Sequence, residues 1–161
     1  MRVYVECVLP YPPEKVWHDL QRPALLRDLS RPIVHFYPAG GAPFPEHWLE
    51  GTTQTFNVHL FGTLPLGAHT IFVERIDPEA RTIQTRESGG QVRRWDHQLR
   101  VRPAGDGRTL YSDEITIEAG WLTGLVWLYA QALYRHRQRR WRRIARRLAA
   151  APGTSFGDEG A

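Results

Sequence analysis

His97 and Asp113 are the two residues whose types and spacing most clearly suggest chemistry. They lie in the two arms of a predicted β-hairpin joined by the turn sequence PAGDG. If Arg102 faces Arg108 across this turn, His97 faces Asp113. A buried carboxylate beside an imidazole fixes the tautomer of the ring and raises its pKa, which suits the pair to orienting a ligand or transferring a proton.

The surroundings of this pair allow three interpretations. Side chains alternate across a strand, so every second residue shares the face of His97 and Asp113. These neighbours are mostly apolar: Trp95, Leu99, Val101, Tyr111, Ile115 and Ile117. In such a layer the pair is a satisfied hydrogen bond of the core, a polar contact for a ligand, or an acid–base pair. No nucleophile or cofactor motif accompanies it, so catalysis is the least favoured of the three.

Other titratable residues give weaker signals. Arg86 and Glu87 end the preceding predicted strand with opposite orientations. Ordinary surface charge is the favoured interpretation, and the alternative is that one of them borders the same cavity. His59 and His69 flank the segment LFGTLPLG and are able to approach each other across it. No local ligand spacing such as His-x-x-x-His supports a metal centre with His97. We therefore predict no metal and no cofactor.

The composition describes a folded domain of ordinary size. The chain has 161 residues, of which 42% are hydrophobic and 24% charged, values that exclude a disordered or fibrous protein. Cys7 is the single cysteine, which excludes an intrachain disulfide framework. The N-terminus lacks the apolar stretch of a signal peptide, and no apolar run is long enough to span a membrane. We expect a cytoplasmic protein.

The order of predicted elements is a strand, two short helices, a long antiparallel meander and one long helix. Pro12 and Pro13 begin the first short helix and Pro23 begins the second, since proline suits a first helical turn. The predicted strands cover residues 2–9, 33–37, 52–61, 68–76, 81–87, 91–102 and 109–119. The segment 121–150 contains no proline and is predicted to be one helix. We expect a single domain over residues 1–150 and a flexible tail over residues 151–161.

This order predicts an α+β fold with a cavity. A curved sheet of about seven strands must cover one face, and the C-terminal helix is the only predicted element long enough to do so. Because the sheet curves and the helix is straight, we expect a space between them of the usual ligand size, about 300–1,000 Å³.

Several segments resemble those of the START-like, or SRPBCC, superfamily. LPYPPEKVWHDL resembles the family's opening strand and first helix, and WLEGTTQTFNVHLFGTLPLG resembles its strand pair after the short helices. VRRWDHQLRV with GRTLYSDEITIEAG resembles its late hairpin, which a long C-terminal helix follows. The resemblance covers residues 1–150 and implies the helix-grip fold, in which members bind lipids, steroids, hormones or polyketides and only some are catalysts.

We therefore expect a cavity that binds a small hydrophobic or amphipathic molecule. The expected ligand contacts are Trp95, His97, Leu99, Tyr111, Asp113, Ile115, Leu125 and Tyr129. Two alternatives stay open. One is a cyclase or dehydratase that uses His97 and Asp113 as its acid–base pair. The other is an anionic surface, nucleic acid or membrane, bound by the end of the long helix.

The second alternative rests on where the positive charge lies. The net charge is +4, and eight of the 21 basic residues are arginines between positions 135 and 147. The remainder of the chain is therefore slightly acidic. We expect the anion-binding residues to be Arg135, Arg139, Arg142, Arg143 and Arg146, whereas Arg137 and Arg140 fall closer to the apolar side of the helix.

Overall fold

Seven antiparallel strands form one sheet in the order β1-β7-β6-β5-β4-β3-β2 in the computed structural model, which describes residues 1–150. The strands are β1 (Arg2–Leu9), β2 (Val34–Pro38), β3 (Thr53–Leu60), β4 (Leu64–Asp77), β5 (Thr82–Gly89), β6 (Val92–Pro103) and β7 (Thr109–Glu118). β2 to β7 form the expected meander, and β1 pairs with β7 at one edge. The predicted α+β class and strand number are confirmed. The tail predicted over residues 151–161 lies outside the described residues.

Two short helices and one long helix complete the fold. α1 (Pro13–Leu20) and α2 (Pro23–Ser30) both begin at a proline, as expected. Short 3₁₀ turns cover Ala39–Gly41 and Gly120–Leu122, and α3 covers Thr123–Ala150. α3 begins two residues later than predicted because the Thr123 hydroxyl accepts from the backbone N–H of Ala119 at 2.9 Å and fixes the preceding turn.

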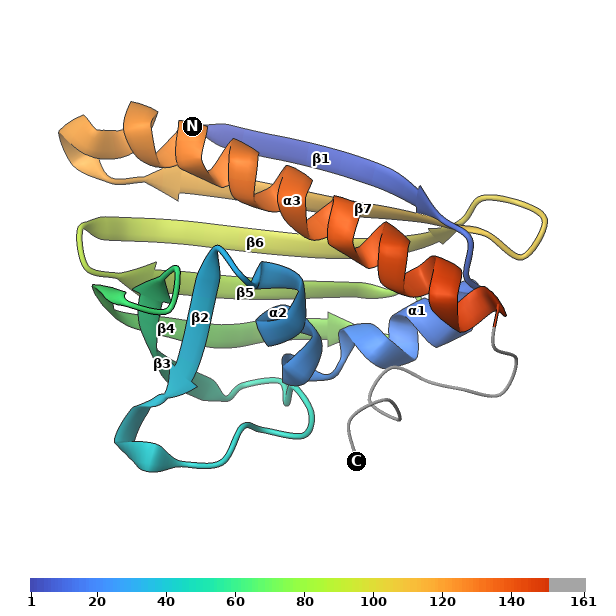
Figure 1. Cartoon of the computed structure of the whole chain (residues 1–161), viewed down its shortest axis with the longest axis horizontal. Coiled ribbons are helices and arrows are strands. Elements are labelled where there is room, and N and C mark those ends of the chain that lie inside the picture. Colours follow the sequence, from blue (N-terminus) through green and yellow to red (C-terminus); the bar gives the residue numbers. More distant parts are fainter. Residues whose placement is uncertain (151–161) are drawn as a thin grey trace.

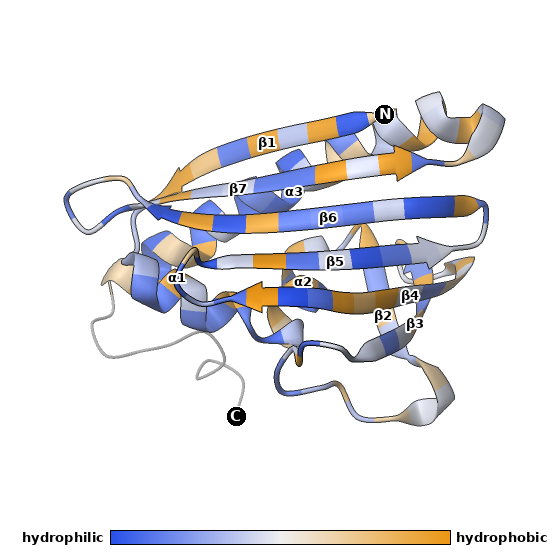
Figure 2. Cartoon of the chain, turned by 180° about the vertical axis from the view of Figure 1, so that it is seen from behind, coloured by the Kyte–Doolittle hydropathy of each residue, from blue (hydrophilic) through white to orange (hydrophobic). Residues whose placement is uncertain are grey.

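All three helices lie on one face of the sheet, and α3 crosses it obliquely (Figure 1). Seen from behind, hydrophilic and hydrophobic residues alternate along much of the length of β1, β6 and β7, as expected for strands with one buried and one exposed face (Figure 2). In β1, every second side chain is buried: Val3, Val5, Cys7 and Leu9.

Register shifts between Val58 and His59 and between Val73 and Arg75 interrupt β3 and β4, and such bulges bend strands. The expected helix-grip arrangement is confirmed. Among residues 1–150, no helix is long and apolar enough to cross a membrane.

The register of the β6–β7 hairpin differs from the prediction by two residues. His97 is paired with Ile115, and Leu99 with Asp113, so the predicted pairing of His97 with Asp113 was wrong. The reversal occurs later because three consecutive residues, at positions 105 to 107, have positive φ angles. A shift by two residues keeps every side chain on its predicted face. His97 and Asp113 are therefore diagonal neighbours on the inner face.

Buried apolar residues form three clusters under α3. One, around Trp141, joins the C-terminal half of α3 to α1 and α2. A second joins Trp95 and Tyr134 to β1 and β7, and a third joins Leu133 to β2, β3 and β4. The second and third clusters lie on the two sides of the space that forms the candidate site.

Candidate ligand-binding site

A cavity of about 500 Å³ lies between the N-terminal half of α3 and the sheet. This volume falls in the range of small-molecule sites, about 300–1,000 Å³. Its apolar wall comes from α2, four strands and α3, and consists of Leu26, Val34, Phe36, Val58, Leu60, Leu66, Ile71, Val92, Trp95, Leu125, Val126 and Leu133. Three of its polar side chains are little exposed: His97 and Arg137 are buried, and the Glu87 side chain is 9% exposed.

A second, much smaller void of about 40 Å³ adjoins this cavity. Both spaces are lined by Leu26, Ile71, Glu87, His97 and Arg137. The small void otherwise contacts core residues near α1 and α2. The three charged residues therefore stand between an open apolar cavity and the closed core, at the inner end of the cavity.

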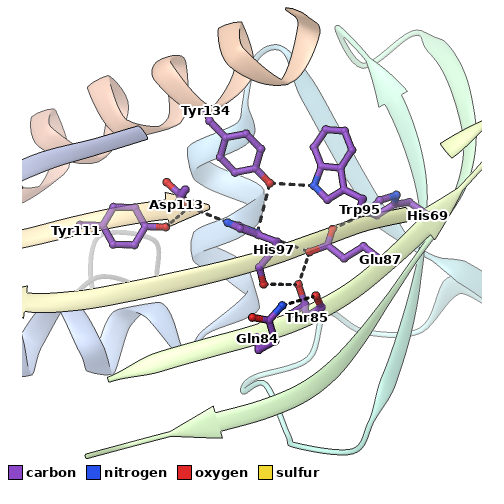
Figure 3. Close-up of polar contacts among 9 residues, drawn as sticks. All are labelled: His69, Gln84, Thr85, Glu87, Trp95, His97, Tyr111, Asp113 and Tyr134. Atoms are coloured by element: carbon purple, nitrogen blue, oxygen red, sulfur yellow. Dashed lines mark hydrogen bonds and ion pairs between the residues drawn. The ribbon is translucent and has the colours of Figure 1, made fainter. Parts of the chain in front are cut away.

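His97 is held from both sides (Figure 3). Its Nε2 lies 2.9 Å from Asp113 Oδ1, and its Nδ1 lies 3.4 Å from the Tyr134 hydroxyl. Asp113, 1% exposed, also accepts from the Tyr111 hydroxyl at 2.5 Å and from Gln138 Nε2 at 3.0 Å. The carboxylate is fully occupied by protein donors and fixes the orientation of the imidazole.

Glu87 forms the second acidic position of the site. Its Oε2 lies 2.8 Å from His69 Nε2, and its Oε1 accepts from the Thr85 hydroxyl at 2.6 Å. Oε1 also lies 3.7 Å from His97 Nδ1. His97 therefore stands between two carboxylates, those of Asp113 and Glu87.

The pKa values of these groups follow from burial opposed by pairing. Burial alone would lower the pKa of His97, but hydrogen bonds and charges from Asp113 and Glu87 outweigh it and raise this pKa. Burial alone would raise the pKa values of Asp113 and Glu87. The histidines beside them hold both below their ordinary values. The favoured state is an imidazolium between two carboxylates.

Two further residues of α3 reach the inner end of the cavity. The Tyr134 hydroxyl accepts from Trp95 Nε1 at 3.1 Å, and its ring lies 5.0 Å from that of His97. Arg137 is 6% exposed, and its guanidinium carbon lies 4.9 Å from the centre of the Tyr134 ring. Arg137 therefore lines the inner end of the cavity with little exposure to bulk solvent.

The structure places the eight predicted ligand contacts in three groups. Trp95, His97, Leu125 and Tyr129 line the large cavity, and Leu99 lines the small void. Tyr111, Asp113 and Ile115 line neither space. These three residues belong to β7. This strand lies beside β1 in the part of the sheet that α3 covers directly. The cavity is lined by β2 to β6, whereas α3 packs closely against β1 and β7.

Sequence reasoning did not select Tyr134 and Arg137 as site residues. Both lie on the apolar side of α3, with Leu133 and Trp141, and Arg137 was expected near that side. A charged residue among apolar residues at helical spacing was the available signal. The apolar lining from α2 and β2 gave no comparable signal, because its residues look like ordinary core.

The weaker titratable candidates divide as follows. Glu87 borders the cavity, whereas Arg86 turns to the other face and pairs with Glu74 and Asp96. His69 lines the cavity, but His59 does not approach it: β3 and β4 pair His59 with Pro65, and its ring packs against Tyr37. Within residues 1–150, no three potential ligands lie close enough together to hold a metal ion.

The arginine-rich end of α3 is a separate surface. The five arginines expected to bind anions are all exposed: Arg135, Arg139, Arg142, Arg143 and Arg146. None of them forms an ion pair with another residue of the described range 1–150. They do not line the cavity. Anion binding by this surface stays a prediction.

The fold is that of START-like proteins. A START superfamily protein from Mycobacterium smegmatis aligns with a TM-score of 0.68 and 14% identity, over 91% of this chain and 98% of that one. Zhui aromatase/cyclase from Streptomyces sp. R1128 aligns with a TM-score of 0.68 and 15% identity, over 95% and 98%. A protein from Chromobacterium violaceum aligns with a TM-score of 0.70 and 13% identity, over 89% and 96%.

The chain belongs to the family DUF8410, described as a domain of unknown function, whose model matches residues 7–145. A search of curated proteins gave no match. The structural likenesses confirm the resemblance to the START-like superfamily at the level of the fold. At these identities they say nothing of the ligand, which has to be argued from the cavity itself.

Proposed function

We propose that the protein binds a small hydrophobic or amphipathic molecule in the cavity between the sheet and α3. The observation that carries this proposal is the cavity of about 500 Å³, with a mostly apolar wall and a polar inner end. Leu66 and Leu125 line it and are 45% and 67% exposed, so the cavity reaches the surface between β4 and α3. An apolar molecule entering there gains contact with the wall and leaves water.

Filling the cavity tests this proposal. N-phenyl-1-naphthylamine, an uncharged dye that fluoresces in apolar surroundings, is expected to bind the wild-type protein. Val126→Trp places an indole in the cavity, because Val126 lines it from α3. We expect this variant to weaken dye binding by about tenfold or more, since the dye and the indole compete for the same apolar contacts.

The matched control is Leu128→Trp, on the same helix. Leu128 is 61% exposed and does not line the cavity, so this variant should bind the dye like the wild type. Fluorescence titration measures all three proteins. Equal affinities in the wild type and Val126→Trp, or no binding by the wild type, would contradict the proposal.

The His97–Asp113 pair favours a second candidate, acid–base catalysis of the cyclase or dehydratase kind. The geometry gives its members unequal roles. His97 lines the cavity and can touch a bound molecule, whereas Asp113 lies behind it and positions the ring. A protonated His97 would donate a proton to the leaving hydroxyl of a β-hydroxyketone as its Cβ–O bond breaks and water leaves. The α-carbon would lose its proton to water, and the Cα–Cβ double bond of the enone would form.

This candidate predicts a measurable turnover. Conversion of a hydrophobic β-hydroxyketone to its conjugated enone, followed by ultraviolet absorbance, should be about a hundredfold slower in His97→Gln than in the wild type. Dye binding checks that the variant keeps its cavity. A wild-type rate no faster than that of His97→Gln would leave the protein as a binding protein only.

A further inference from the structure

Arg137 is a buried cation that the protein itself leaves without a partner. It is 6% exposed and lines both the large cavity and the small void. Its Nε is buried and makes no hydrogen bond, and its guanidinium forms no ion pair with any residue in the described range 1–150. Its guanidinium carbon lies 4.9 Å from the centre of the Tyr134 ring. Buried charges are ordinarily paired, so this one calls for an explanation.

The nearby carboxylates do not provide one. Both oxygens of Glu87 are occupied, by His69 and by Thr85. Both oxygens of Asp113 are occupied too, by donors that do not include Arg137. Burial alone would lower the pKa of Arg137, but the surrounding groups raise it, so the guanidinium stays charged. The inner end of the cavity therefore holds a permanently charged arginine that no carboxylate of residues 1–150 pairs with.

Tyr134 supplies a second donor on the same wall. Its oxygen already accepts from Trp95 Nε1 at 3.1 Å. His97 has a raised pKa, and in its protonated form both ring nitrogens donate, so it cannot accept the proton of the Tyr134 hydroxyl. That proton is available to a molecule in the cavity. Tyr134 lies three residues before Arg137, so the two side chains share one face of α3.

We propose that the cavity selects amphipathic molecules that end in a carboxylate, which Arg137 and the Tyr134 hydroxyl bind at the inner end. The apolar remainder of the molecule lies along the wall toward Leu66 and Leu125. This inference rests on the proposed function, since it names the chemistry of the molecule that the cavity takes. An arginine and a hydroxyl supply N–H and O–H donors in the arrangement that a carboxylate accepts.

The test compares two molecules that differ only at the head group. Decanoate and decanol each displace N-phenyl-1-naphthylamine from the protein at pH 7.5, where decanoate is ionised. A purely apolar cavity prefers decanol, because a carboxylate loses its hydration on entry. With the carboxylate bound to Arg137, decanoate should displace the dye at a concentration about tenfold lower than decanol.

Two variants identify the residues responsible. Arg137→Met removes the charge and keeps much of the volume, and it should reverse the preference so that decanol binds more tightly. Tyr134→Phe removes the hydroxyl alone and should weaken decanoate by about threefold to tenfold without changing decanol. Arg102→Met, at an exposed position of β6 that lines neither the cavity nor the small void, is the control and should keep the wild-type preference.

The outcomes separate this inference from the proposed function. Absence of dye binding contradicts the cavity proposal itself. Dye binding with decanol equal to or better than decanoate in the wild type overturns the carboxylate assignment and leaves the cavity proposal standing. If Arg137→Met does not fold, a selective loss of decanoate affinity in Tyr134→Phe supports the assignment, and an unchanged affinity overturns it.

Discussion

Replacing Asp113 by alanine is expected to lower the free energy of unfolding by about 3–5 kcal/mol, the usual effect of removing one member of a buried ion pair. Asp113 is 1% exposed and accepts hydrogen bonds from His97, Tyr111 and Gln138. Alanine leaves all three donors buried without their acceptor, and it leaves His97 with Glu87 as its only carboxylate. Urea denaturation followed by circular dichroism measures the change.

The control for this prediction is Glu114→Ala, one residue further along β7. Glu114 faces the other side of the sheet and pairs with Arg2 in a solvent-exposed ion pair. Its loss should change stability by less than about 1 kcal/mol. Tyr111→Phe separates the contributions further, because it removes one donor to Asp113 and keeps the ring. Equal effects of Asp113→Ala and Glu114→Ala would contradict the ion pair as a major source of stability.

The His97–Asp113 pair also predicts that the stability of the fold decreases at both low and high pH. The folded pKa of Asp113 is below its ordinary value of 3.8, so its contribution is present above that pH and is lost as the pH falls through the folded pKa. The folded pKa of His97 is above its ordinary value of 6.5. Its contribution is present below that pH and is lost as the pH rises through the folded pKa.

In Asp113→Asn, the pKa of His97 measured by NMR should fall, and an unchanged value would exclude Asp113 as its main partner.

The inner layer of the sheet could be predicted because it follows from alternation alone. Trp95, His97 and Leu99 share one face whatever the register of the hairpin. The error of two residues in the predicted register therefore left the assignment of side chains to faces correct. The register itself depended on three left-handed residues in the turn at positions 105 to 107. PAGDG indicated a turn, but composition did not show where along it the chain reverses.

The cavity wall could be predicted only in part, because it depends on how α3 crosses the sheet. Tyr111 and Ile115 have the same apolar character as Trp95, yet they lie where other elements cover the sheet directly. The same limit on prediction from sequence applies to Arg137 on α3. Arginine on an apolar side ordinarily extends its charged end to water, and only the three-dimensional arrangement shows that this one ends in a cavity.

Trp141→Ala is expected to cost about 3–5 kcal/mol, the usual cost of removing a large aromatic side chain from a core. Trp141 is 1% exposed and is the largest fully buried side chain of residues 1–150. Its ring lies 4.5 Å from that of Tyr111 and belongs to the cluster that joins α3 to α1 and α2. For a chain of this size, the melting temperature should fall by about 10 °C. Trp121→Ala is the matched control, because Trp121 is 91% exposed, and it should melt like the wild type.

This variant also separates the stability of the fold from binding. Trp141 lines neither the cavity nor the small void, so below its melting temperature Trp141→Ala should keep the wild-type preference for decanoate over decanol. Arg137→Met should lose that preference. Loss of the preference in Trp141→Ala would mean that the position of Arg137 depends on the packing of α3 one turn further on. The donors at the inner end would then be set by the core beneath α1 and α2, and not by the cavity wall alone.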